Sequence, residues 1–273
     1  MKRLFLATSA LIVAGSAQAA DLGARPYTKA PVVAAVPFSW TGCYVGGHVG
    51  GGWSRTGFTD PAIATGVPGF PVTTTGALPG DRIGVNGDGV VGGVQAGCDY
   101  QFSNNWVIGI AGDFAGTDIH GVANDPFFGG KSGNPATLSS RTDWVASVTG
   151  RVGYTWDRFL VYGKGGVGFA HDRYSLDNFI TVGGFFCGPP FIACNATTST
   201  DRVGWTAGAG VEWAFAPNWS ALVEYNHYGF DSKRVGFVNP AGSTALIDIR
   251  QDIDIVKVGI NYRFGGSAVV AKY

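Results

Sequence analysis

Thiol oxidation is the first chemistry that the residue types suggest, because the chain contains four cysteines. Cys187 and Cys194 bracket a six-residue interval with two prolines, and this spacing predicts a disulfide that staples a loop. Cys43 and Cys98 lie far apart in the sequence, within segments of alternating polar and apolar residues. These two could bridge neighbouring strands or could be small apolar wall residues, and the sequence leaves both possibilities open.

Metal and phosphate chemistry have less support. The histidines, His48, His120, His171 and His227, show no paired ligand spacing, so we expect no metal site. The glycine-rich run at 163–168 is similar to a phosphate-binding loop, but no Ser or Thr follows its lysine and the run lies inside a predicted strand. We therefore expect no catalytic residue and no cofactor.

The segment Leu246–Phe264 indicates which structural elements position the polar residues. Alternate residues at its end are apolar, finishing in an aromatic pair: Val256, Val258, Ile260, Tyr262 and Phe264. The residues between them are polar or glycine: Lys257, Gly259, Asn261 and Arg263. A period of two predicts a β-strand with one apolar face, which a soluble sandwich or a membrane barrel could contain. The ending Tyr262-x-Phe264 is typical of the insertion signal of bacterial outer-membrane barrels, so we predict that role for this pair, with Tyr273 at the end of the tail as the alternative.

Eight such segments follow one another, joined by connections of alternating length. The predicted strands are Trp40–Trp53, Gly87–Phe102, Trp106–Ile119, Thr142–Trp156, Phe159–Tyr174, Arg202–Phe215, Trp219–Gly229 and Ile247–Phe264. Tight turns follow the second, fourth and sixth strands, whereas long connections rich in Gly, Pro, Thr and Asn follow the others. This layout predicts an all-β fold, an up-and-down, eight-stranded antiparallel transmembrane β-barrel with periplasmic turns and outer loops.

Strand parity assigns a set of charged side chains to the barrel interior. In Arg202–Phe215 the odd-numbered residues are apolar, whereas the even-numbered ones include Glu212. The same parity elsewhere predicts a lumen network of Asp113, Arg151, Lys164, Glu212, Glu224, Lys257 and Arg263. Asp99, near the end of the second strand, would balance four acids against four bases. Side chains fill an eight-stranded barrel, so we expect these charges to pair and to close the lumen to anything larger than small ions.

Aromatic side chains gather at both ends of the predicted strands. Those near the tight turns include Tyr100, Phe102, Trp106, Trp213, Phe215 and Trp219, and those near the long loops are Trp53, Trp144, Phe169 and Trp205. Amphipathic rings favour the headgroup zones of a membrane. From Trp144 to Tyr154 is ten residues, which at about 3.3 Å per residue and a tilt near 40° spans about 25 Å, the height of the apolar band in such barrels.

Composition and the start of the chain agree with an exported β-rich protein. The chain has 44 glycines and 14% charged residues, and its formal net charge of zero gives no reason to expect a nucleic-acid partner. Two early cationic residues, an apolar run and a small-x-small site predict a secretory signal peptide over residues 1–20. We expect a flexible periplasmic lead-in at 21–38, the outer-membrane β-barrel at 39–264 and a C-terminal tail at 265–273.

Three motifs resemble one known family. They are Trp-Thr-Gly-Cys-Tyr-Val-Gly-Gly at 40–47, Gly-Arg-Val-Gly-Tyr at 150–154 and Val-Gly-Ile-Asn-Tyr-Arg-Phe at 258–264, and the stretch 21–31 is also similar. They resemble the alphaproteobacterial outer membrane immunogenic or porin-family proteins, which share an OmpA-like eight-stranded barrel. The resemblance covers nearly the whole mature chain. It implies a role in envelope integrity and surface exposure, and it implies no catalytic residues.

We therefore expect a non-enzymatic protein of the outer membrane of a Gram-negative bacterium, contributing to envelope structure and presenting its loops. The expected partners are outer-membrane lipid and lipopolysaccharide, the barrel-assembly machinery, and host or envelope ligands at the loops. Three alternatives stay open: a porin for small solutes or ions, a lipid-modifying enzyme and a soluble periplasmic lipocalin-like binder. The enzyme would need a cluster of His, Ser or Asp at the outer lipid rim, where the sequence offers His171 and His227.

Overall fold

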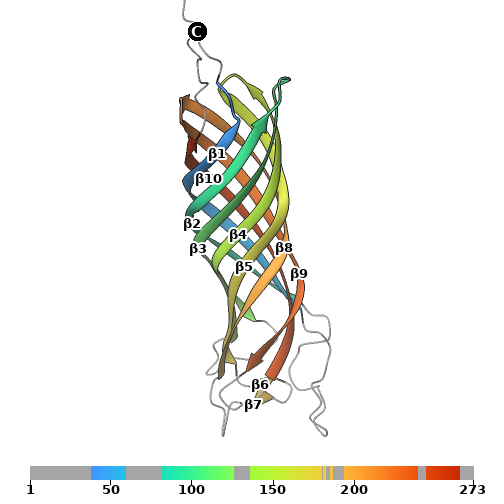
Figure 1. Ribbon diagram of the computed structural model, residues 1–273. Coiled ribbons are helices and arrows are strands. Elements are labelled where there is room, and N and C mark those ends of the chain that lie inside the picture. Colours follow the sequence, from blue (N-terminus) through green and yellow to red (C-terminus); the bar gives the residue numbers. More distant parts are fainter. Residues whose placement is uncertain are drawn as a thin grey trace, which may run out of the picture. The chain divides into compact units, whose positions relative to one another are not determined.

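A computed structural model describes residues 38–59, 82–125, 136–179, 181–182, 185–186, 194–238 and 244–264. Eight long strands form one closed barrel (Figure 1). The strands are β1 (Gly42–Thr59), β2 (Arg82–Gln101), β3 (Trp106–Asp125), β4 (Ala136–Trp156), β5 (Phe159–Phe179), β8 (Cys194–Ala216), β9 (Trp219–Val238) and β10 (Thr244–Phe264). A separate two-stranded hairpin, β6 (Thr181–Val182) with β7 (Phe185–Phe186), lies between β5 and β8 in the chain. No helix of the described residues is long and apolar enough to cross a membrane.

The order of strands around the barrel is that of an up-and-down barrel. Each long strand pairs antiparallel with the next long strand in the chain, and β1 closes the ring against β10. The tight turns adopt left-handed backbone conformations at Asn105 and Asp157, where φ is 68° and 53°. The sequence prediction of the fold class is confirmed. We call the end with the tight turns the periplasmic end and the opposite end the outer end, following the rule for such barrels.

The outward face of the wall is apolar between two levels of aromatic residues, as the parity of the strands predicts. On β8, Val203, Trp205 and Val211 point outward with 67%, 53% and 45% of their surface exposed. Such an exposed apolar wall is stable only against lipid, because in water it would be a large unburied hydrophobic surface.

The strands are longer at the outer end than the sequence analysis predicts. The predicted strand Phe159–Tyr174 continues to Phe179, and the predicted strand Arg202–Phe215 begins at Cys194. Much of each predicted long loop is therefore paired β-structure. On β8 the predicted strand began beside Val203, where the apolar outward face begins, but the ladder with β5 continues to Cys194.

The polarity of the wall inverts where the apolar outward face ends, and β10 shows the change most clearly. On the periplasmic side, Val256 points outward and Lys257 points into the lumen. On the outer side of that level, Asp254 lies on the outward face, whereas Ile255 and Ile253 are buried inside. The barrel is thus apolar outside and charged inside within the membrane. Beyond it, the outward face is mostly polar and the interior is mostly apolar.

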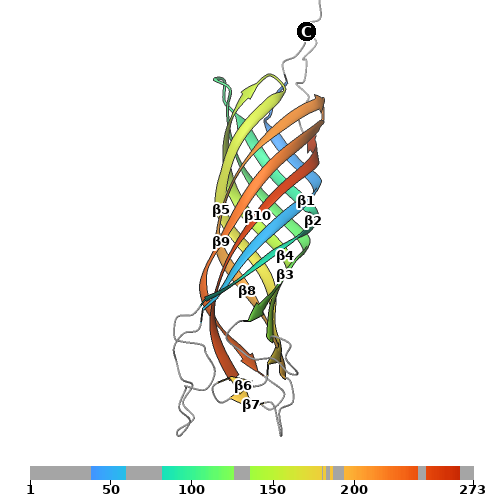
Figure 2. The ribbon, with the colours of Figure 1, turned by 180° about the vertical axis from the view of Figure 1, so that it is seen from behind.

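The closed ladder parts into two sheets at the outer end (Figure 2). Pairing between β2 and β3 ends at Asp88 and His120, and pairing between β8 and β9 ends at Trp205 and Gly229. The other ladders continue, leaving β2, β1, β10 and β9 on one side and β3, β4, β5 and β8 on the other. Both sides contribute to one apolar core, the head core, made of Phe58, Val85, Leu138, Tyr174, Leu176, Ala196, Val235, Phe237 and Ile249.

Candidate functional site

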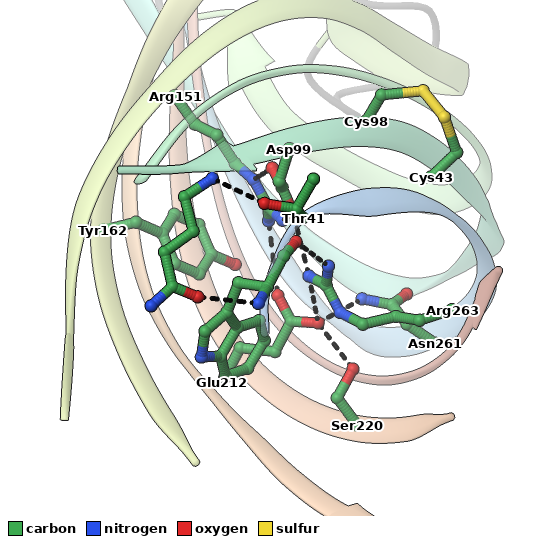
Figure 3. Close-up of polar contacts among 12 residues, drawn as sticks. Thr41, Cys43, Cys98, Asp99, Arg151, Tyr162, Glu212, Ser220, Asn261 and Arg263 are labelled. Carbon is green, nitrogen blue, oxygen red and sulfur yellow. Dashed lines mark hydrogen bonds and ion pairs between the residues drawn. A yellow bond between two sulfur atoms is a disulfide. The ribbon is translucent and has the colours of Figure 1, made fainter. Parts of the chain in front are cut away.

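Four charged side chains near the periplasmic end form a closed ring across the lumen, which we call the lower quartet (Figure 3). Its members alternate in sign: Asp99 on β2, Arg151 on β4, Glu212 on β8 and Arg263 on β10. Arg151 binds Asp99 through two nitrogens, one of them at 2.6 Å, and contacts Glu212 at 3.3 Å. Arg263 closes the ring with contacts of 2.9 Å to Asp99 and 3.2 Å to Glu212.

Neutral groups satisfy the remaining oxygens and stack on the guanidinium groups. The Ser220 hydroxyl donates to Glu212 at 2.6 Å, and the Asn261 amide donates to the same carboxylate at 2.9 Å. Both guanidinium groups lie over the ring of Tyr44, at 4.7 Å for Arg151 and 5.0 Å for Arg263. A planar guanidinium suits this place because it can bind a carboxylate bidentately and still stack on an aromatic face.

A second ring, the upper quartet, lies next along the strands toward the outer end. It joins Asp113 on β3, Lys164 on β5, Glu224 on β9 and Lys257 on β10. Glu224 contacts Lys164 at 2.7 Å and Lys257 at 3.1 Å, and Asp113 contacts the same two ammonium groups at 3.7 and 3.5 Å. Every side chain in it is at most 6% exposed. Each quartet therefore contains two acids and two bases and is formally neutral.

The space between the quartets is filled. Tyr162 and Asn226 donate to Glu224 at 2.6 and 2.7 Å, and Gln95 donates to Asn261 at 2.7 Å. A cavity of about 10 Å³ remains, lined by residues of both quartets, including Arg151 and Lys164. That volume is about enough for a single water molecule.

The structure thus brings together all seven charged lumen residues that the parity argument names, with Asp99 as the eighth. It also contains a third buried pair that sequence analysis missed. Arg202 on β8 lies 3.4 Å from Asp172 on β5, and it donates to the carbonyls of Asp231 at 3.3 Å and Ile249 at 2.9 Å. Asp172 and Arg202 lie at the outer ends of predicted strands, 159–174 and 202–215, with parities that point inward, but the predicted lumen network did not include them.

Trp40 closes the periplasmic mouth, which corrects the predicted start of the first strand at that residue. Strand β1 begins at Gly42, whose φ of 140° is open to glycine, and the chain before it turns inward. The Trp40 side chain is 0% exposed. Its carbonyl accepts from Arg263 at 3.0 Å, its ring lies 4.5 Å from the same guanidinium, and its indole donates to the Asp157 carbonyl at 3.3 Å.

Four other predicted site residues, Cys43, Cys98, Tyr262 and Phe264, lie on the outer surface of the wall. A disulfide joins Cys43 and Cys98, so of the two possibilities left open by the sequence the structure has the bridge. The proposed insertion signal, Tyr262 and Phe264, is exposed on the outward face, with ring centroids 5.0 Å apart. Of the predicted loop disulfide, Cys187 and the side chain of Cys194 lie outside the described part of the chain, so that bond stays a prediction.

Two histidines occupy the outer rim, each paired with an aspartate of the neighbouring strand. The Nδ1 of His171 lies 2.7 Å from Asp201, and the Nδ1 of His227 lies 2.8 Å from Asp254. No hydrogen bond between described residues joins either imidazole to a Ser or Thr hydroxyl. Another rim histidine, His120, is exposed on β3.

The outermost part of the strands carries ordinary surface ion pairs. Arg234 on β9 binds Asp248 on β10 through two nitrogens, at 2.8 and 2.9 Å. The hydrogen bonds from Arg234 lower the pKa of the Asp248 carboxyl, and the reciprocal contact raises the pKa of Arg234.

The fourth histidine, His48, is buried in the lumen. No group of three or more His, Cys, Asp or Glu in the described residues could hold a metal ion.

A closed antiparallel barrel with an apolar outward band and a charged lumen defines the class, an integral β-barrel protein of the bacterial outer membrane. The family described as the outer membrane protein beta-barrel domain matches residues 5–264, and the chain belongs to this family. Its location is therefore the outer membrane, as predicted.

Curated relatives extend along the whole chain. The chain is 30% identical over 266 residues to the 31 kDa outer-membrane immunogenic protein of Brucella melitensis biotype 1, covering 97% of this chain and all of that one. It is 25% identical to the 25 kDa outer-membrane immunogenic protein of Brucella abortus biovar 1, covering 97% and 99%. Among solved structures, the outer membrane protease OmpT from Escherichia coli superposes with a TM-score of 0.47 at 8% identity, covering 85% and 99% of the two chains.

Proposed function

We propose that the protein is a non-enzymatic structural component of the outer membrane, a barrel with a closed lumen that carries its long loops outside the cell. The pair of stacked neutral quartets is the observation that carries this proposal. Each quartet crosses the lumen from wall to wall, and the cavity between them has room for about one water. On this basis the barrel anchors the outer loops in the membrane and does not conduct solutes.

A liposome-swelling assay tests the porin alternative. We expect vesicles containing the purified, heat-modifiable protein to shrink and stay shrunken in a sugar solution, because the lumen admits no sugar. A general-diffusion porin reconstituted at the same protein-to-lipid ratio is the control that shows the assay can detect an open lumen. Swelling of the vesicles that contain this protein would contradict the closed-lumen proposal and favour the porin alternative.

Complementation in cells tests the enzymatic alternative. Lipid modification at the rim would have to use the His–Asp pairs, but nucleophilic catalysis needs a hydroxyl or thiol next to the base, and none is bonded there. We expect a deletion strain to be more sensitive to detergents and bulky antibiotics, and both the wild-type gene and the His171→Ala/His227→Ala variant to restore resistance. An expressed, folded double variant that restores nothing would favour the enzyme.

The same proposal names the partners of the barrel. Outer-membrane lipid and lipopolysaccharide surround the exposed apolar wall, and the barrel-assembly machinery inserts it. The loops at the outer end would meet host or envelope ligands. Photocrosslinking checks the lipid contact. A photoreactive residue that replaces Val203, on the outward face, should crosslink to lipid, whereas one that replaces Val235, in the head core, should not.

A further inference from the structure

The disulfide between Cys43 and Cys98 lies on the side of the wall opposite to the charged lumen. The two residues face each other across β1 and β2, with Cα atoms 3.9 Å apart. Both side chains are exposed on the outward face. Figure 3 shows the bond outside the ribbon, pointing away from the lower quartet. The sulfurs therefore face whatever surrounds the barrel.

The surroundings at this level are lipid. On the outward face of β2, Cys98 is followed toward the periplasmic turn by Tyr100 and Phe102, which are 55% and 41% exposed. Phe102 is four residues further along, or about 10 Å nearer the periplasm after allowing for strand tilt. The register places Cys98 beside Ile110 and Cys43 beside Phe264, both exposed apolar residues. The bond thus lies on the membrane side of Tyr100 and Phe102 and level with Phe264, at the inner edge of the periplasmic aromatic residues.

That position limits when the bond can form. Thiol–disulfide exchange requires a thiolate and direct contact with the oxidant. An apolar medium disfavours the thiolate, and charged or protein oxidants do not enter the hydrocarbon layer. Once the wall is in place, neither cysteine meets these two requirements.

We propose that Cys43 and Cys98 are oxidised before the barrel enters the membrane, by exchange with the disulfide of a soluble periplasmic thiol oxidant. One cysteine thiolate attacks the oxidant's disulfide and forms a mixed disulfide, which the second cysteine resolves. In total the two cysteines lose two electrons and two protons, and the oxidant's disulfide gains both and becomes a dithiol. The partner is thus a soluble dithiol/disulfide protein that acts ahead of the barrel-assembly machinery.

The same order of events determines how the barrel closes. The bond joins residues 55 positions apart, so it holds β1 against β2 while the rest of the chain is unpaired. The other edge of β1 accepts β10 in the finished barrel, with Cys43 opposite Phe264. The β1–β2 hairpin then forms first and leaves the other edge of β1 free, and the pairing of that edge with β10 closes the barrel.

A reconstitution experiment tests the order directly. In a Cys187→Ser/Cys194→Ser background, reduced protein is inserted into vesicles and then given glutathione disulfide, and the same oxidant is given to the unfolded chain in urea. We expect oxidation of the inserted barrel to be at least roughly tenfold slower. Ser103→Cys, in a background lacking all four native cysteines, is the matched control, because this turn residue is exposed and should react with a membrane-impermeant maleimide after insertion. Equal oxidation rates in the two states would overturn the proposal.

Pulse labelling in cells gives an independent test. Chains are trapped with an alkylating agent at successive times, then assayed for the bond and for heat-modifiable migration. We expect chains that already hold the disulfide but are not yet heat-modifiable. Heat-modifiable barrels whose Cys43 and Cys98 are still reduced, and later become oxidised, would show that the bond follows insertion.

Discussion

Arg151 on β4 and Glu212 on β8 meet at 3.3 Å inside the barrel, although β5 lies between their strands in the wall. The contact is possible because the lumen is narrow enough for one side chain to span the gap between non-adjacent strands. Asp99 and Arg263 complete the ring through their own contacts. The ion pairs of this ring thus join strands that share no ladder hydrogen bonds.

Truncation of Arg151 should therefore destabilise the barrel strongly. Arg151→Ala leaves Asp99 and Glu212 with only Arg263 as a cationic partner, in a site where the side chains are at most 4% exposed. Removing one partner of a buried charge pair costs about 3–5 kcal/mol. We expect that loss in urea-induced unfolding from vesicles. Arg173→Ala is the control, because its pair with Asp143 is solvent-exposed and should contribute about 0–1 kcal/mol.

The facing of β8 can be tested at Ala209, midway between the outward-facing Trp205 and Trp213. Ala209→Arg puts a charge against lipid near the middle of the membrane and should cost about 2–4 kcal/mol of unfolding free energy. Ser199→Arg is the matched control on the same face of the same strand, beyond the membrane. If both variants lose the same small amount, Ala209 does not face lipid.

The head core should stabilise the outer end of the strands without determining the stability of the barrel within the membrane. Phe237→Ala removes a fully buried aromatic side chain, at a local cost of about 3–5 kcal/mol. Hydrogen exchange in β9 and β10 should rise beyond Gly229, while heat-modifiable migration persists. Val238→Ala, at an outward residue, serves as the control. Loss of the heat-modifiable form would mean that the head and the membrane barrel unfold together.

Removal of the disulfide should lower stability through the unfolded chain. The bond closes a loop between residues 55 positions apart, and the chain-entropy argument gives about 4 kcal/mol for a loop of that size. Cys43→Ser/Cys98→Ser should unfold at lower urea with the register of β1 unchanged. A Cys187→Ser/Cys194→Ser variant isolates this bond from the predicted loop disulfide. An unchanged unfolding midpoint would show that the first hairpin is already ordered in the unfolded ensemble.

The sequence was sufficient to predict the membrane half of the fold because one rule holds there throughout. Apolar residues face lipid and polar residues face the lumen, so Val256 and Lys257 each indicate their own side. That rule gave the eight strands, the closing order and the members of both quartets. It could not give the partners within each quartet, because contacts such as Lys164 with Glu224 depend on barrel shear and side-chain reach.

Beyond the membrane the same rule misleads, because water and not lipid surrounds the outward face there. Ile253 and Ile255 on β10 belong to the interior, whereas Asp252 and Asp254 lie outward, so apolar residues there no longer mark the outward face. Asp172 and Arg202 lay within predicted strands, but parity alone gave no reason to pair them. Trp40 was placed in a strand because aromatic residues are common at strand ends, but its burial under Arg263 is a tertiary contact with no local signal.

Single-channel recording in planar bilayers tests the central claim, that the quartets close the lumen. With folded protein in the bilayer, moderate voltage is applied at both polarities. We predict a flat baseline without reproducible current steps, because no water-filled path continues past Arg151 and Lys257. The protein is delivered by fusing vesicles with the bilayer, and its folded state is verified in parallel by heat-modifiable migration of the protein in those vesicles. Reproducible current steps of one unitary size from the unmodified protein would contradict the closed-lumen account.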